Sequence, residues 1–128
     1  PRVQYALAGH LPIFHITPSG AVTDLANQSL PLGLFPEESY LCGDTIASHG
    51  DLFALYTDGL TELPHPAAPG TARQPGHDGL RAVILSHAGG TSLAAAHSAI
   101  LAQARTADPQ ADDQTLVLVR VLDRSAAN

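Results

Sequence analysis

Apolar residues alternate with polar or small residues at the start of the chain, which is the period of two typical of a half-buried strand. Val3, Tyr5 and Leu7 are the apolar members of this pattern. Turn residues then separate two further short segments, which we expect to pair as a hairpin. The predicted strands in this part of the chain are residues 3–8, 13–17 and 21–25.

The middle of the chain is apolar but broken by proline and glycine. Residues 30–37 are predicted to form a loop that tucks its leucines and Phe35 inward, because Pro and Gly prevent a regular element there. Residues 40–47 are expected to form a strand. Residues 51–57 are nearly all apolar, as in a strand covered on both faces. Residues 64–79 are rich in Pro and Gly and are predicted to form a mobile surface loop.

Helical spacing marks the last third of the chain. A first helix carries Leu80, Val83, Ile84 and His87 on one face and ends at Gly89-Gly90. Thr91 or Ser92 is the N-cap of a second helix, whose buried face is Leu93, Ala96, Ile100, Leu101 and Ala104. Residues 115–122 then read as a strand with two largely apolar faces. Strands, two helices and a final strand predict an α+β fold with mainly antiparallel sheets.

Composition limits the classes of protein to which the chain can belong. Its length of 128 residues allows one domain and no more, and its net charge of −6 makes a nucleic-acid-binding function improbable. Lysine is absent, which excludes a phosphate-loop or Schiff-base lysine, and the single Cys42 excludes an internal disulfide framework. No apolar run is long enough to cross a membrane and no signal peptide opens the chain, so we expect a cytoplasmic protein that does not bind membranes.

Carboxylates at strand ends are the candidate ligands for a metal. Asp58 follows the apolar segment 51–57, and Asp112-Asp113 precedes the final strand. Such acids on neighbouring strands could share Mg²⁺ or Mn²⁺, although Asp-Gly is also an ordinary turn. A zinc site built on His10 and His15 is an alternative that ranks lower, because the seven histidines lack ligand spacing.

Four segments strengthen the carboxylate interpretation: YALAGHLP at residues 5–12, LPLGLFP at 30–36, GDLFALYTDGLTE at 50–62 and QADDQTLV at 110–117. In this order they resemble the motifs of SpoIIE-type bacterial serine phosphatases, a branch of the protein phosphatase 2C superfamily. The resemblance implies a partial protein phosphatase 2C-like α-β-β-α sandwich. It also implies metal-dependent hydrolysis of phosphoserine or phosphothreonine on a protein. The expected substrate is an anti-sigma-factor antagonist in bacterial sigma-factor regulation.

The resemblance also implies roles for particular residues. Asp58 and Asp112 match metal ligands of the family, in a site that holds two Mn²⁺ or Mg²⁺ ions in the complete domain. A metal-activated water performs the attack there, so no catalytic side chain is expected. The residues that the resemblance places near the site are Gly9, His10, Gly59 and Asp113.

One family segment has no counterpart in the sequence. Family members carry a G-D-x-x-G-H-G segment, whose Asp bridges both metals, upstream of the motif at residues 5–12. We therefore expect residues 1–128 to be the C-terminal portion of a single SpoIIE-like phosphatase domain, inactive or nearly so on its own. The alternative is a degenerate phosphatase module that binds a regulatory protein without turnover. Exposed strand edges predict a homodimer or another association through those edges.

Overall fold

A computed structural model describes the chain except for residues 28, 62–75, 91, 105–112 and 124–128. The chain divides into two compact units. Unit 1 comprises residues 1–55 and 119–128, and unit 2 comprises residues 56–118.

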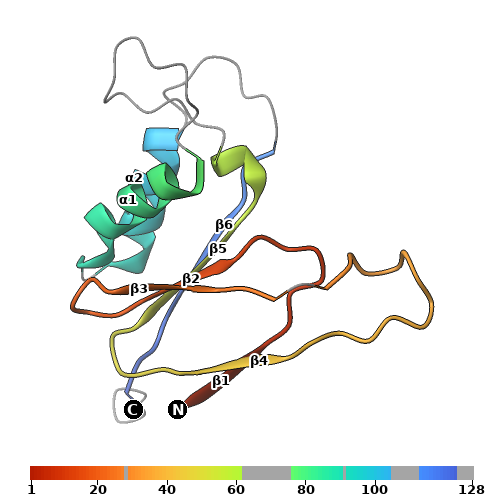
Figure 1. Cartoon of the computed structure of the whole chain (residues 1–128). Helices are drawn as coiled ribbons and strands as arrows, with labels where there is room; N and C mark the ends of the chain where they lie inside the picture. Colours follow the sequence, from red (N-terminus) through yellow and green to blue (C-terminus); the bar gives the residue numbers. More distant parts are fainter. Residues whose placement is uncertain (28, 62–75, 91, 105–112, 124–128) are drawn as a thin grey trace. The chain divides into compact units, whose positions relative to one another are not determined.

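Among the described residues, six strands form two sheets (Figure 1). The smaller sheet pairs β1 (Arg2–Tyr5) with β4 (Gly43–Ile46), and the larger sheet has the order β3-β2-β5-β6. The strands of the larger sheet are β2 (Ile13–Ile16), β3 (Val22–Leu25), β5 (Leu52–Tyr56) and β6 (Leu116–Arg120). β1 with β4, β2 with β3, and β2 with β5 all pair antiparallel. The predicted α+β class with mainly antiparallel sheets is therefore confirmed.

The hairpin predicted from the turn at Pro18-Ser19-Gly20 is present in unit 1. β2 pairs with β3 in a register that runs from Ile13 opposite Leu25 to Ile16 opposite Val22. The hydrophobic core of this unit is built from the apolar sides of several strands. Its buried members are Leu7, Ile13, Leu25, Ala47 and Phe53, with Val3, Tyr5, Leu55 and Val121 packed against them. As predicted for residues 51–57, β5 is buried along most of its length.

The described part of unit 2 contains a short 3₁₀ helix, η1 (Asp58–Leu60), and two α-helices, α1 (Gly76–Ala88) and α2 (Leu93–Ala104), which pack on each other. Both α-helices fall where helical spacing predicted them. Ser92 caps α2, because its Oγ accepts a hydrogen bond from Ala95 N at 3.2 Å. Neither described helix is long and apolar enough to cross a membrane.

Two sequence predictions about loops need correction. The leucines of residues 30–37 and Phe35 point outward, with Leu32 74% and Phe35 55% exposed. Pro31, Gly33 and Pro36 prevent strand pairing there, and no described element covers these side chains. In addition, residues 76–79 belong to α1 rather than to the loop predicted over 64–79. The predicted mobility of residues 64–75 lies outside the described residues.

β6 shows only one buried face, although its sequence reads as apolar on both. Leu116 is buried, whereas Val117 and Val119 are each 47% exposed. β6 ends the strand order of the larger sheet. A strand with an exposed apolar face at the edge of a sheet can pair with another chain.

Candidate active site

Asp58 begins η1 at the point where β5 ends. Its carboxylate is exposed, and Oδ1 accepts a hydrogen bond from Gly59 N at 3.0 Å. The peptide behind it is fixed, because Thr61 N donates to Asp58 O at 2.8 Å and both Gly59 and Leu60 are buried. Asp58 is therefore an exposed anionic group on a rigid turn.

Thr57 joins the end of β5 to the start of β6. Its Oγ1 donates to Asp113 O at 3.1 Å and accepts from Thr115 N at 2.9 Å. Thr57 N also donates to Thr115 O at 3.2 Å, and Gln114 Nε2 donates to Gly59 O at 3.3 Å. We call these four hydrogen bonds the Thr57 clamp. The clamp holds the residue before Asp58 against the main chain of Asp113.

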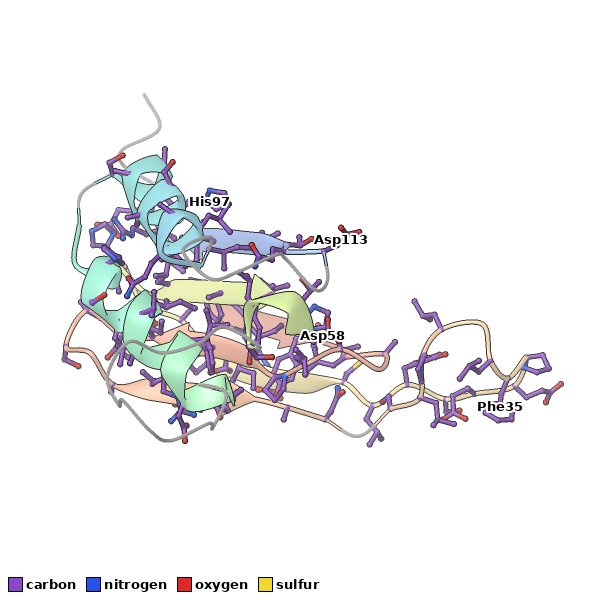
Figure 2. The ribbon with its side chains drawn as sticks, turned by 90° about the horizontal axis from the view of Figure 1, so that it is seen from above. Phe35, Asp58, His97 and Asp113 are labelled. Carbon is purple, nitrogen blue, oxygen red and sulfur yellow. The ribbon has the colours of Figure 1, made fainter. Side chains whose placement is uncertain are left out.

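Figure 2 shows the consequence of the clamp for the two acids. Asp58 and Asp113 lie at the same end of β5 and β6, and both are exposed. The structure thus brings together three of the predicted site residues: Asp58, Gly59 and Asp113. Asp112, the second predicted metal ligand, lies outside the described residues.

The clamp residues themselves were missed by sequence reasoning. The sequence pattern marks Thr57 only as the last residue of a strand and as part of the motif at residues 50–62. Gln114 is a position at which the D-D-x-T motif accepts any residue. The available signal was a hydroxyl residue directly before an Asp-Gly turn, because threonine can bond to nearby main-chain groups.

Replacing Thr57 by Val should lower the free energy of unfolding by about 1–2 kcal/mol, because both hydrogen bonds of the hydroxyl are lost. Thr57→Ser keeps the hydroxyl and should recover most of that loss. Urea denaturation of the two variants and the parent chain measures the difference. A loss in Thr57→Ser with none in Thr57→Val would show that the methyl group, not the hydroxyl, stabilises this corner.

Gly9 and His10 belong to unit 1. Gly9 adopts a φ of +70°, and its N–H donates to Ser29 O at 3.0 Å. A Cβ at this position would come within 2.6 Å of Pro31 Cγ, so glycine is required by the local packing. His10 is exposed, and its Nδ1 donates to Leu11 O at 2.7 Å.

The structure gives His15 a role in the core. It is 6% exposed, and its Nε2 donates to Asp51 Oδ2 at 2.8 Å. Its ring stacks on Phe53 with 4.5 Å between centroids. In the described part of the chain, no three His, Cys, Asp or Glu side chains gather as a metal site. The alternative of a zinc site on His10 and His15 gains no support from this arrangement.

The oxygen donors near the end of β5 are of the chemical type that a hard divalent cation binds. Asp58 and Asp113 offer carboxylate oxygens, the ligand type that Mg²⁺ and Mn²⁺ prefer. Both side chains are exposed, so a cation could bind them and keep several of its waters. These two acids fit as part of a coordination shell whose other members would be water or further oxygen ligands.

Comparison with known proteins decides the family. The sequence matches the family model of stage II sporulation protein E (SpoIIE) over residues 1–122. The chain belongs to the SpoIIE family. No curated protein matches it.

Solved structures of similar fold agree with this assignment. The chain is 22% identical to the RsbU and RsbW domains of Rv1364c from Mycobacterium tuberculosis (TM-score 0.71), covering 93% of this chain and 32% of that one. It is 20% identical to the SiaA-PP2C domain of Pseudomonas aeruginosa (TM-score 0.73), covering 94% and 46%. It is 21% identical to RsbX, solved in complex with magnesium (TM-score 0.58), covering 91% and 48%. The predicted protein phosphatase 2C-like fold is confirmed, and the chain spans less than half of each of these structures.

Proposed function

We propose that the protein is a metal-dependent protein serine/threonine phosphatase and that residues 1–128 are the C-terminal portion of one SpoIIE-like domain. The observation that carries this proposal is the Thr57 clamp, which places Asp58 and Asp113 at the same end of two adjacent strands. Membership of the SpoIIE family supplies the reaction class.

Asp58 is the proposed metal ligand among the described residues, together with Asp112 as the family motif implies. Mn²⁺ or Mg²⁺ bound there would lower the pKa of a water and neutralise phosphoryl oxygens. The magnesium in the RsbX structure favours this class of ion. Within the chain, Gly59 N–H orients the Asp58 carboxylate, and Gln114 fixes the carbonyl of Gly59. Asp113 adds negative charge beside the ligand.

The proposed substrate is a phosphoserine on a small protein of the anti-sigma-factor antagonist type, in the bacterial cytoplasm. The similarity to the RsbU and RsbW domains, which occur together in one protein, supports a regulatory protein as partner. The net charge of −6 gives the chain no broad basic surface to attract phosphate. We therefore expect the substrate to be recognised through local contacts.

Hydrolysis of an aryl phosphate in the presence of Mn²⁺ tests the reaction class. The protein as its gene encodes it should hydrolyse the aryl phosphate with Mn²⁺ and lose this activity with EDTA. The 128-residue chain alone should show little or no hydrolysis, because no G-D-x-x-G-H-G segment is present. Absence of metal-dependent hydrolysis in the encoded protein would refute the phosphatase proposal.

A non-catalytic module that binds a regulatory protein is the second candidate. It is favoured by the sequence, which lacks the G-D-x-x-G-H-G segment whose Asp bridges both metals in the family. It would be established by Mn²⁺-independent binding of a phosphoprotein without release of phosphate.

A homodimer through exposed strand edges is also part of the proposal. β6 ends the larger sheet with Val117 and Val119 exposed, so a second copy of the chain can pair there. Light scattering of the 128-residue chain tests this, and a mass equal to one chain at all concentrations would contradict it.

A further inference from the structure

A histidine interrupts the apolar face of α2. Leu93, Ala96 and Ile100 fall at helical spacing on this face, and Ala96 and Ile100 are buried. His97 lies four residues after Leu93 and three before Ile100, so it shares the same face. It is half-buried. A polar side chain at such a position needs a hydrogen-bond partner, because burial takes it away from water.

The partner of His97 is the main chain of β6. His97 Nε2 lies 3.1 Å from Leu116 O. A carbonyl oxygen can only accept a hydrogen bond, so Nε2 carries a proton and donates it. Figure 2 shows His97 on α2 beside β6. This hydrogen bond joins α2 to the first residue of β6.

The hydrogen bond lies on the outer edge of β6. Main-chain groups along an antiparallel strand point alternately to its two sides. Thr57 N donates to Thr115 O, so the groups of residue 115 face β5 and those of Leu116 face away from it. Because β6 ends the strand order of the larger sheet, none of the described strands pairs with that outer edge. His97 therefore binds a carbonyl that no described strand reaches.

Both edges of β6 are thus held at the end where the acids lie. The Thr57 clamp holds this end from the side of β5, and His97 holds it from the side of α2. Asp113 lies three residues before Leu116. Metal sites bind more tightly when groups outside the ligand shell hold the acidic residues in place. α2 therefore belongs to the support of the site at the end of β5.

We propose that His97 is a positioning residue for the metal site. Its hydrogen bond to Leu116 O fixes the start of β6 and holds Asp113 where its charge supports the ion bound by Asp58. His97 itself touches neither the ion nor the substrate. This inference rests on the proposed metal-dependent phosphatase and deepens it by assigning a role to α2.

Two amide substitutions at residue 97 isolate the hydrogen bond. In His97→Gln the amide nitrogen can take the place of Nε2, whereas in His97→Asn it reaches only as far as Nδ1. Neither side chain is charged, so the two variants differ mainly in reach. Electron paramagnetic resonance of free Mn²⁺ measures the affinity of the encoded protein. The affinity should fall by about 10-fold in His97→Asn and stay close to that of the parent in His97→Gln. Equal affinities in the two variants would overturn the proposal.

Ala99→Gly is the control for a loss of stability alone. Ala99 lies in the interior of α2, and glycine there destabilises the helix because it loses more backbone entropy on folding. This variant keeps His97 and its hydrogen bond. It should lower the thermal midpoint of the encoded protein and leave the Mn²⁺ affinity unchanged. An equal loss of affinity in Ala99→Gly and His97→Asn would mean that His97 acts only through the stability of α2, and would overturn the positioning role.

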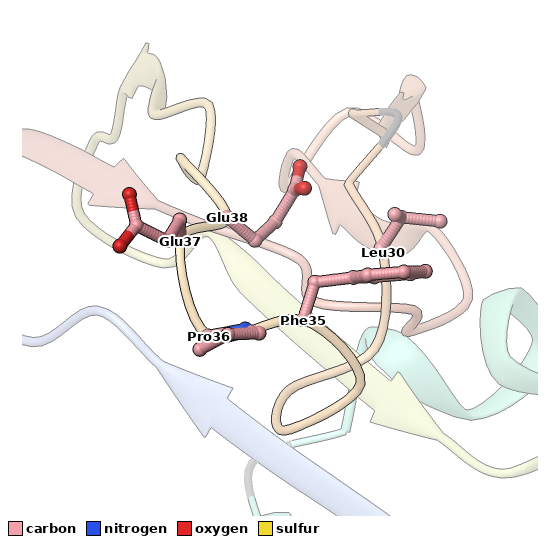
Figure 3. A pocket seen from close by; sticks show the side chains of 5 residues that line it. All are labelled: Leu30, Phe35, Pro36, Glu37 and Glu38. Atoms are coloured by element: carbon pink, nitrogen blue, oxygen red, sulfur yellow. The ribbon is translucent and has the colours of Figure 1, made fainter.

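A second pair of adjacent acids can bind Mn²⁺ in the same measurement. Glu37 and Glu38 belong to unit 1, where they line a shallow hollow of about 410 Å³ together with apolar residues that include Phe35 (Figure 3). The double variant Glu37→Gln/Glu38→Gln should leave the Mn²⁺ affinity unchanged. An affinity that falls in this variant, but not in the two variants at residue 97, would place the measured ion at the hollow and overturn the proposal.

A measurement without metal separates failure of this inference from failure of the proposed function. Hydrogen exchange of the encoded protein, followed by mass spectrometry of peptides that cover residues 113–118, reports how firmly the start of β6 is held. Exchange there should be faster in His97→Asn than in His97→Gln. A protein that binds Mn²⁺ and hydrolyses an aryl phosphate, but shows equal exchange and equal affinity in the two variants, would refute the positioning role alone. A protein that binds no Mn²⁺ would refute the proposed function, and faster exchange in His97→Asn would still show that His97 fixes this strand.

Discussion

Asp51→Ala is expected to lower the free energy of unfolding by about 3 kcal/mol, because His15 Nε2 and Ser48 N both lose their hydrogen-bond acceptor. Asp51 is 2% exposed, and its Oδ2 accepts hydrogen bonds from His15 Nε2 at 2.8 Å and from Ser48 N at 2.9 Å. The variant leaves the buried His15 without its acceptor. His15 is held on its other sides, where its ring stacks on Phe53, so it cannot turn easily toward water.

Asp44→Ala is the control for this loss. Asp44 pairs with Arg2 at 3.0 Å, but their side chains are 48% and 63% exposed. An exposed pair contributes only about 0–1 kcal/mol. Urea denaturation of both variants at neutral pH gives the comparison. Similar losses in Asp51→Ala and Asp44→Ala would mean that burial of the His15 pair adds no stability.

Stability should also depend on pH through Asp51. Burial raises the pKa of its carboxyl, but the hydrogen bond from Ser48 and the hydrogen bond and charge of His15 outweigh burial and bring the pKa below the usual 3.8. The carboxylate therefore contributes its full stability above pH 3.8, and this contribution is lost as the pH falls through the lower pKa of the folded state.

The difference in unfolding free energy between the parent chain and Asp51→Asn measures this effect, because the other carboxyl groups are common to both proteins. The difference should be constant at neutral pH and shrink below pH 3.8. A difference that shrinks only as the pH rises would contradict the sign of the pKa change.

Much of the fold could be predicted from the sequence because its signals are local. The alternation at β1, the turn before β3 and the helical spacing of Leu80 and Ile84 each depend on neighbouring residues. Such patterns fix which face of an element is buried and where the element ends. The positions of Asp58 and Asp113 at strand ends could be predicted in the same way.

The outward direction of Leu32 and Phe35 could not be predicted in this way. Apolar composition shows that Leu32 and Phe35 favour burial, but it does not show whether the burying partner belongs to the same 128 residues. The inward prediction assumed that it does, and the 74% exposure of Leu32 contradicts that assumption. Burial depends on every part of a domain, whereas the sequence pattern describes only the segment itself.

The Thr57 clamp and the His15–Asp51 pair could not be predicted from the sequence, for a related reason. Each joins residues far apart along the chain: Thr57 with Thr115, and His15 with Asp51. Side-chain hydrogen bonds over such separations depend on the register of neighbouring strands, which short-range patterns do not determine. The motif at residues 50–62 contains both Asp51 and Thr57, yet the motif alone does not separate a core acid from a ligand acid.

That separation can be measured by substituting Asp58, the proposed metal ligand. Asp58→Asn should reduce the Mn²⁺ affinity and the Mn²⁺-dependent hydrolysis of the encoded protein by about 100-fold, since even outer-shell substitutions at metal sites cost 10–100-fold. The amide of Asn removes the charge but can still accept the hydrogen bond from Gly59 N. Because residue 58 is also exposed, the free energy of unfolding should stay within about 0.5 kcal/mol of that of the parent.

Asp78→Asn is the matched control for Asp58→Asn, because Asp78 is an exposed acid in the first turn of α1 with a side chain that is 90% accessible. It should leave Mn²⁺ affinity and hydrolysis unchanged. Electron paramagnetic resonance of free Mn²⁺ measures affinity independently of turnover, so a binding defect is distinguished from a catalytic one. Unchanged affinity in Asp58→Asn, or an equal loss in Asp78→Asn, would show that the carboxylate at the end of β5 does not hold the metal. A loss of Mn²⁺ affinity confined to Asp58→Asn, together with an effect of Asp51→Ala on stability alone, would separate the roles of the two acids. Asp58 would then serve the metal site and Asp51 the core, although they lie seven residues apart in one motif.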